Sequence, residues 1–234
     1  MMQQAGYRTA CTGKWHLGID WQLKDPDKPQ ILTPEKFGYT NIDFSQPVKS
    51  APTEWGFDYS FILPASLDMP PYVFLRNDRV MDDDIILTAD AYPHTLEETG
   101  FSWDRRYTGK EDIYWERGVW WRNGEMSRSF QFEKCLQTIV DEGIHFIEKA
   151  SEEDQPFFLY LPLTGPHTPW MASEESKGKT AIGTYGDFIQ DIDQTVGLIR
   201  RKLEKLDLSE ETIVIFASDN GAAWTEIVKR SGRR

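Results

Sequence analysis

A pattern of helix, polar turn and apolar strand occurs twice in the second half of the chain. In residues 184–206 apolar side chains recur every three or four positions, which predicts an amphipathic helix. The run IVIFA at residues 213–217 then predicts a short strand buried on both faces. The earlier copy predicts a helix over residues 132–147 and a strand over residues 157–161. Two such units predict an α/β domain with a mostly parallel sheet flanked by helices.

Polar residues follow both predicted strands. Residues 164–167 (TGPH) come after the first and residues 218–221 (SDNG) after the second, and parallel sheets bind ligands at these carboxyl ends. Prolines on both sides of His167 restrict the backbone, which suits a catalytic imidazole but equally a proline-rich turn with an incidental histidine. Asp219 and Asn220 offer hard oxygen ligands for Ca²⁺ or Mg²⁺, although a turn that only caps a strand would look the same.

A third cluster lies near the start of the chain, where residues 6–18 read GYRTACTGKWHLG. Lys14 and His16 are two positions apart, so on extended backbone their side chains would project from the same face. A cation beside an imidazole is suited to binding an anion. A surface lysine next to an incidental histidine would show the same spacing, so the pair alone does not establish a site.

Composition limits what the chain can bind. Its 234 residues are enough for one domain or two small ones. The net charge of −12 argues against electrostatic binding to nucleic acid or to anionic lipid. No apolar run is long enough to span a bilayer, and no leader pattern opens the sequence. Residues 20–123 lack a sustained period and predict irregular loops and short elements packed over the sheet. The acidic run at residues 82–84 predicts a solvated surface.

Taken together, these segments resemble the sulfatase family of the alkaline phosphatase superfamily. Residues 6–18 resemble the family's second signature, LPLTGPHTPW resembles its mid-chain histidine segment, and IVIFASDNGA resembles its metal-binding strand end. Residues 56–72 and 185–199 also look like family sequence. The resemblance implies an alkaline-phosphatase-like fold and a sulfuric ester hydrolase. Its substrate would be a small sulfate ester or a carbohydrate sulfate.

The resemblance also implies roles for individual residues. In the family a formylglycine, made from Cys or Ser, is hydrated and attacks the sulfur of the ester. By motif, Lys14 would bind sulfate oxygens, and His16 would assist breakdown of the covalent intermediate. His167 would bind the sulfate and protonate the leaving alcohol. Ser66 matches a substrate-site serine of some members, and Asp219 and Asn220 would supply part of a Ca²⁺ site, with Mg²⁺ as an alternative ion.

The sequence lacks the family's nucleophile motif and its first metal-binding aspartates. Cys11 is followed by TGKW and Cys135 by LQTI, so neither sits in the Cys-x-Pro-Ser-Arg motif that yields the nucleophile. The family's first metal aspartates would precede Gly6. Residues 1–234 are therefore expected to be a partial sulfatase catalytic domain, cut at both ends and inactive alone.

Two alternatives to a sulfatase stay open. One is a phosphoesterase or phosphonate hydrolase of the same superfamily, and the other is a non-catalytic truncated paralogue that acts as a binding or structural domain. Family members are commonly exported, which implies a periplasmic, secreted or lysosome-like compartment. Nothing in the sequence indicates the oligomeric state.

Overall fold

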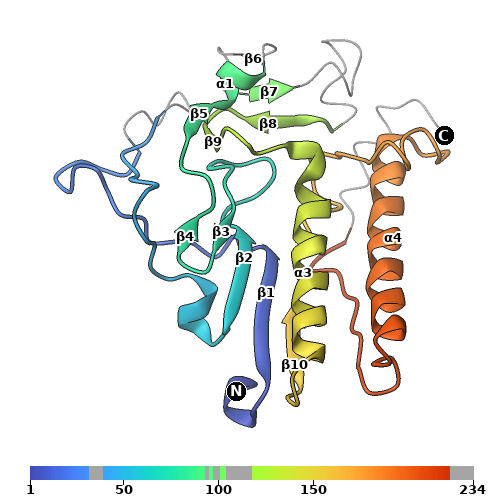
Figure 1. Cartoon of the computed structure of the whole chain (residues 1–234). Coiled ribbons are helices and arrows are strands. Elements are labelled where there is room, and N and C mark those ends of the chain that lie inside the picture. The colour runs from blue at the N-terminus through green and yellow to red at the C-terminus, as the bar shows by residue number, and fades with distance from the viewer. Residues whose placement is uncertain (32–38, 93–94, 97–100, 104–117, 222–234) are drawn as a thin grey trace.

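A five-stranded sheet organises the molecule (Figure 1). The computed structural model describes residues 1–31, 39–92, 95–96, 101–103 and 118–221. The order across the sheet is β10-β1-β2-β3-β4. The strands are β1 (Arg8–Lys14), β2 (Tyr59–Leu63), β3 (Leu75–Arg76), β4 (Arg79–Val80) and β10 (Phe157–Tyr160).

The sheet is parallel where it carries the polar strand ends. β1 pairs in parallel with β10 on one side and with β2 on the other, whereas β2, β3 and β4 pair antiparallel. The carboxyl ends of β10, β1 and β2 therefore meet at one edge. The predicted α/β class with flanking helices is confirmed, and the sheet is mixed rather than wholly parallel.

Both predicted helices are present. The helix α3 (Cys135–Ser151) follows a short 3₁₀ turn, η4 (Phe132–Lys134), and α4 (Thr184–Lys205) follows residues 161–183. Phe146 and Ala150 of α3 pack with Ala10 of β1, against Tyr59 and Leu159 on the neighbouring strands. The two helices lie side by side in Figure 1 and are joined by an ion pair between Lys202 and Glu148. The apolar stripe of α3 thus covers one face of the sheet.

Residues 20–123 contain more order than their pattern predicts. β2 lies in the middle of the main sheet, and its sequence YSFIL is too short to show a period. Outside that sheet, the described elements are η1 (Gln3–Ala5), η2 (Pro52–Trp55), β5 (Ile85–Leu87), α1 (Thr88–Ala91), β6 (Thr95–Leu96), β7 (Phe101–Trp103), β8 (Trp120–Arg122) and β9 (Glu125–Ser127). A buried aromatic cluster that includes Tyr72, Trp121 and Phe132 joins this region to the start of α3.

The predicted strand at residues 213–217 is wrong as a paired strand. The segment forms no strand pairing, and the side chains of Ile213, Ile215 and Phe216 are 88%, 84% and 68% exposed. A strand needs a neighbour for its hydrogen bonds, and among the described residues none lies beside this one.

No helix in the described part of the chain is long and apolar enough to cross a membrane.

Candidate functional site

Lys14 is placed by the close approach of β1 to the segment that follows β10. It is the last residue of β1, and its main-chain nitrogen donates to the carbonyl oxygen of Pro162 at 2.8 Å. The preceding Gly13 has φ +147°, and a Cβ there would lie 2.1 Å from that same oxygen. Only glycine permits this approach, so the sequence TGK brings the Lys14 ammonium to the carboxyl edge of the sheet.

His16 does not share a strand face with Lys14. β1 ends at Lys14, and His16 has φ 52°, with its main-chain nitrogen donating to the oxygen of Pro64 at 3.1 Å. The prediction of two side chains projecting from one strand is therefore wrong in its geometry. The two groups still interact. Partial burial lowers the pKa of His16 below its usual value, and the Lys14 cation and His167 lower it further, while Asp68 opposes them.

His167 lies in the loop after β10, as its position in the sequence predicts. The indole nitrogen of Trp170 donates to the carbonyl oxygen of Pro166 at 3.1 Å and anchors the loop beside it. The ring nitrogen Nδ1 of His167 lies 2.7 Å from the carbonyl oxygen of Thr168. Because a carbonyl oxygen only accepts, Nδ1 carries a proton, which leaves Nε2 as the ring nitrogen that can exchange one with a ligand.

Asp68 joins the histidines to the rest of the fold. Its carboxylate is buried, and one oxygen, Oδ1, accepts from the Ser66 hydroxyl at 2.7 Å and lies 4.0 Å from Nδ1 of His167. The other oxygen, Oδ2, accepts from Nη1 of Arg122 at 2.6 Å. Asp68 and Arg122 are absent from the predicted site. Asp68 could have been noticed two positions after Ser66, but no sequence signal connects it to Arg122.

Ser66 is brought to the site, but in a buried position. Its side chain is 2% exposed and its hydroxyl proton is used by Asp68. The prediction that Ser66 binds substrate stays a prediction, since the contact that the structure provides is to the carboxylate.

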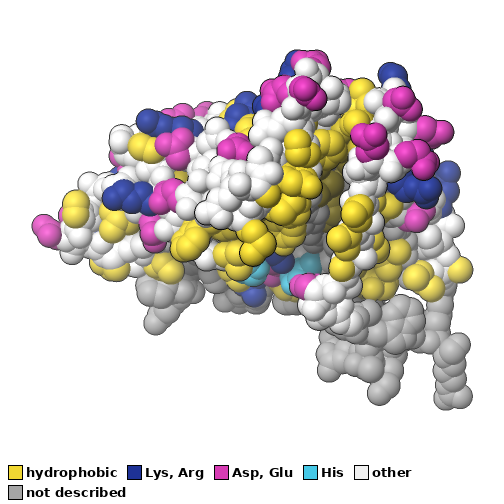
Figure 2. All heavy atoms as spheres, turned by 90° about the horizontal axis from the view of Figure 1, so that it is seen from below, with side chains coloured by type: hydrophobic (Ala, Val, Ile, Leu, Met, Phe, Trp, Pro, Cys, Tyr) yellow, Lys and Arg dark blue, Asp and Glu magenta, His cyan; other side chains and the backbone are white. Residues whose placement is uncertain are grey.

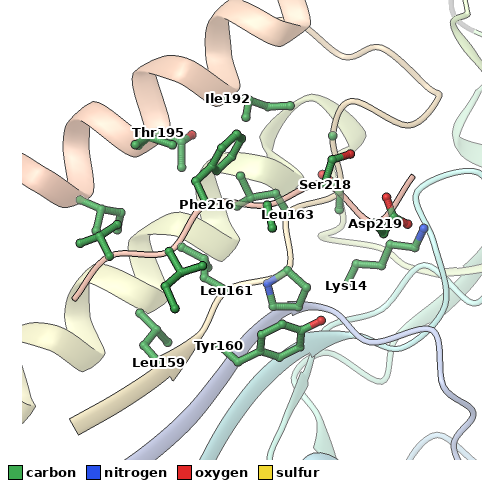
Figure 3. Close-up of a pocket in the computed structure, with 18 of the residues that line it drawn as sticks. Lys14, Leu159, Tyr160, Leu161, Leu163, Ile192, Thr195, Phe216, Ser218 and Asp219 are labelled. Atoms are coloured by element: carbon green, nitrogen blue, oxygen red, sulfur yellow. The ribbon is translucent and has the colours of Figure 1, made fainter. Parts of the chain in front are cut away.

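Asp219 and Asn220 come to the same cavity from the other side. Figure 3 shows the side chains of Asp219 and Lys14 projecting into the same space. Both Asp219 and Asn220 are exposed, and the Ser218 hydroxyl donates to the Asn220 carbonyl oxygen at 2.7 Å. Within the described ranges, no three His, Cys, Asp or Glu side chains are close enough together to hold a metal ion. The prediction that Asp219 and Asn220 bind a metal ion stays a prediction.

The cavity that these residues line has a volume of about 2220 Å³. Its polar end holds Lys14, His16, His167 and Asp219, and its remaining length runs between β10 and α4 over apolar side chains such as Leu159 and Ile192. Figure 2 shows imidazole, acidic and basic side chains gathered at one end of a hollow lined by hydrophobic ones. The charged groups are thus collected where parallel sheets bind ligands.

The acidic run at residues 82–84 and the two cysteines lie outside this cavity. Asp84 pairs with Arg128 at 2.7 Å on the surface and Asp82 accepts from Ser129, so the acidic run lies away from the cavity. Cys11 and Cys135 are buried, and burial raises the pKa of Cys11 to about 12 and that of Cys135 further. Neither thiol is placed to act as a nucleophile.

Comparison with known proteins gives matches along the whole chain. A family model described as Sulfatase matches residues 1–233. The N-acetylgalactosamine-6-O-sulfatase of Bacteroides thetaiotaomicron is 32% identical over 94% of this chain and 42% of its own length. The N-acetylgalactosamine-6-sulfatase of Rattus norvegicus is 28% identical over 99% of this chain and 34% of its own length. The chain therefore spans less than half of these curated relatives.

Solved structures agree with the sequence matches. A structure from work on the metabolism of multiple glycosaminoglycans by Bacteroides thetaiotaomicron superposes with a TM-score of 0.69 at 26% identity, over 99% of this chain and 47% of its own. The sulfatase PsFucS1 from Pseudoalteromonas, at a TM-score of 0.52 and 19% identity over 96% of this chain and 38% of its own, shares the fold. With its alkaline-phosphatase-like sheet and the family match over nearly all of its residues, the chain belongs to the sulfatase family of sulfuric ester hydrolases.

Proposed function

We propose that this part of the chain forms the sulfate-binding wall of a sulfuric ester hydrolase site in the complete protein. The observation that carries the proposal is the meeting of Lys14, His16 and His167 at one end of a single cavity, although they come from two separate segments. A cation and two imidazoles can neutralise a sulfate group and handle the proton of an ester oxygen.

The three residues have different roles in this proposal. Lys14 makes no ion pair with any residue in the described ranges, so its ammonium is available to a sulfate oxygen. The lowered pKa of His16 favours a neutral ring, which accepts a proton from a hydroxyl. His167 keeps its Nδ1 proton on the Thr168 carbonyl oxygen and exchanges a proton at Nε2, which suits the acid that protonates the leaving alcohol.

Asp219 and Asn220 have the kind of oxygen ligand that a divalent ion binds, but two ligands are too few to hold one. Their oxygens are the hard ligands that Ca²⁺ or Mg²⁺ prefers, yet Ca²⁺ takes six to eight such ligands. A bound ion would polarise the sulfate group. Its further ligands would have to come from outside the described residues, and the residue converted to formylglycine from a motif that this sequence does not contain.

The substrate class follows from the relatives. Two of them are named for N-acetylgalactosamine 6-sulfate, a sulfated sugar, so a carbohydrate sulfate is the substrate that we propose for the complete protein. A small aryl sulfate is the convenient test compound. An exported compartment, whether periplasmic, secreted or lysosome-like, is the location that we propose by family resemblance.

The test compares the complete protein with its His167→Ala variant on an aryl sulfate and on N-acetylgalactosamine 6-sulfate. General acid catalysis typically contributes about 10²- to 10⁴-fold, so we expect kcat to fall by at least about 100-fold. Residues 1–234 alone should show no turnover. Faster hydrolysis of the matching phosphate ester would favour a phosphoesterase, and absence of any ester hydrolysis by the complete protein would favour a non-catalytic paralogue.

A further inference from the structure

The Asp68 carboxylate divides its two oxygens between the protein scaffold and the site. Oδ2 is held by the Arg122 guanidinium at 2.6 Å, and the Asp68 carbonyl oxygen also accepts from the Arg122 main-chain nitrogen at 3.1 Å. Oδ1 accepts from Ser66 and faces Nδ1 of His167 at 4.0 Å. Pairing with Arg122 alone would use only Oδ2.

Because Asp68 is buried, its charge acts strongly on the groups beside it. The residue is 6% exposed, so its negative charge is poorly screened by water and acts strongly on nearby groups. His167 lies within 4.0 Å, and His16 also interacts electrostatically with the carboxylate. The carboxylate thus faces His167 directly, and it acts to raise the pKa of His16 against the larger effects of burial and Lys14.

We propose that Asp68 is a positioning residue that keeps Nδ1 of the His167 ring turned toward the Thr168 carbonyl oxygen and the carboxylate, and so leaves Nε2 for the ligand. Resting on the function proposed above, the consequence is that Nε2 of a protonated His167 donates its proton to the oxygen of the leaving alcohol, as the bond from that oxygen to sulfur breaks and the sulfur bonds to the oxygen of the nucleophile in the complete protein. The Nδ1 proton stays between the Thr168 carbonyl oxygen and Asp68. His167 ends the step as a neutral ring, and Asp68 remains ionised throughout.

The proposal is tested by titrating the histidines of the 234-residue chain, using ¹⁵N nuclear magnetic resonance of the imidazole rings. Asp68→Asn keeps the shape and an acceptor oxygen but removes the charge. We expect the titration midpoint of His16 to move to lower pH, because Asp68 acts to raise its pKa. The ring ¹⁵N shifts of His167 should also change, because Nδ1 loses the carboxylate that it faces. His145 on α3 serves as an internal reference and should not move. The charged and titratable groups that act on His16 are Lys14, Asp68 and His167, and the group that faces His167 is Asp68, which also pairs with Arg122.

Asp84→Asn is the matched control, since Asp84 also pairs with an arginine, Arg128, but on the surface away from the cavity. It should leave the His16 midpoint and the His167 ring shifts unchanged. Asp68→Glu restores the charge and should return both readouts toward those of the native chain. Unchanged ring ¹⁵N shifts of His167 in a folded Asp68→Asn variant overturn the proposal.

A measurement on the native chain covers the case in which Asp68→Asn fails to fold. The ¹⁵N shifts of neutral His167 report its tautomer, and we expect the proton on Nδ1, facing Thr168 and Asp68. A proton on Nε2 instead would overturn the proposal. Neither readout involves turnover, so they stand or fall separately from sulfate ester hydrolysis.

Discussion

At the residue scale, His16 and His167 are two imidazoles at one end of the cavity that share Asp68 as a charged neighbour but differ in their other contacts. His16 is partly buried and lies beside the Lys14 cation, which lowers its pKa. His167 donates from Nδ1 to a carbonyl oxygen and faces the Asp68 carboxylate. The two rings therefore differ in their hydrogen-bond partners and in the charges beside them.

Lys14→Met tests the cause of the His16 shift. The substitution removes a positive charge that disfavours the imidazolium, so the titration midpoint of His16 should rise toward its usual value. Nuclear magnetic resonance titration measures it, with Lys28→Met as the control, because Lys28 pairs with Asp25 on the surface. A His16 midpoint that stays constant or falls would show that burial alone lowers it.

The two cysteines should be unreactive in the folded chain. With the pKa of Cys11 raised to about 12, only about one thiol in ten thousand would be ionised at pH 8, and the thiolate is the reactive form. Iodoacetamide labelling followed by mass spectrometry should find neither cysteine modified under native conditions and both modified in guanidinium. Rapid labelling of either residue in the native chain would contradict their burial.

At the element scale, the site depends on how the end of β1 meets the segment after β10. A parallel sheet brings the carboxyl ends of β10, β1 and β2 to one edge. The hydrogen bond from the Lys14 main-chain nitrogen to the Pro162 carbonyl oxygen then fixes the point at which the Lys14 side chain leaves β1. β2 contributes by leading into the loop that carries Asp68. The strand pairing is thus what converts separate motifs into one cavity wall.

Gly13→Ala should disturb that contact. The new Cβ would lie 2.1 Å from the Pro162 carbonyl oxygen on a backbone with positive φ, so we expect a loss of roughly 2 kcal/mol in unfolding free energy. Gly197→Ala in α4 is the control. Its Cβ would meet only the flexible end of Arg201, and alanine favours helices by about 1 kcal/mol. Urea unfolding should show opposite signs, and equal effects would refute the role of Gly13.

At the scale of the whole molecule, an exposed apolar surface lies along the cavity. Ile213, Ile215 and Phe216 are exposed, and Phe158 on β10 is 37% exposed at the open edge of the sheet. Extended, exposed apolar segments beside a free strand edge promote association. The same surface explains why the hydrophobic hollow of Figure 2 continues beyond the charged end.

Ile215→Lys should therefore reduce self-association of the chain. Light scattering over a concentration series should show a lower apparent mass than for the native chain, because the added charge interrupts the apolar run. Trp55→Lys is the control, since Trp55 is 69% exposed in η2 and does not line the cavity. Equal effects of the two substitutions would mean that exposed apolar area in general, not this segment, drives association.

The sequence by itself determined the two helices, the strand β10 and the chemical groups of the site. Helical periodicity and runs of apolar residues are local properties, so they can be read without knowing the fold. Lys14, His16, His167 and Asp219 were found in this way and with the help of motif resemblance. All four line one cavity.

Tertiary structure decided the rest. It placed β2 in the centre of the sheet, turned His16 off the end of β1, and left residues 213–217 without a strand partner. It also joined Asp68 to Arg122, which is 54 positions away. Hydrogen bonds and charge interactions act over a few ångströms in space, whatever the separation along the chain, so no local pattern can report them.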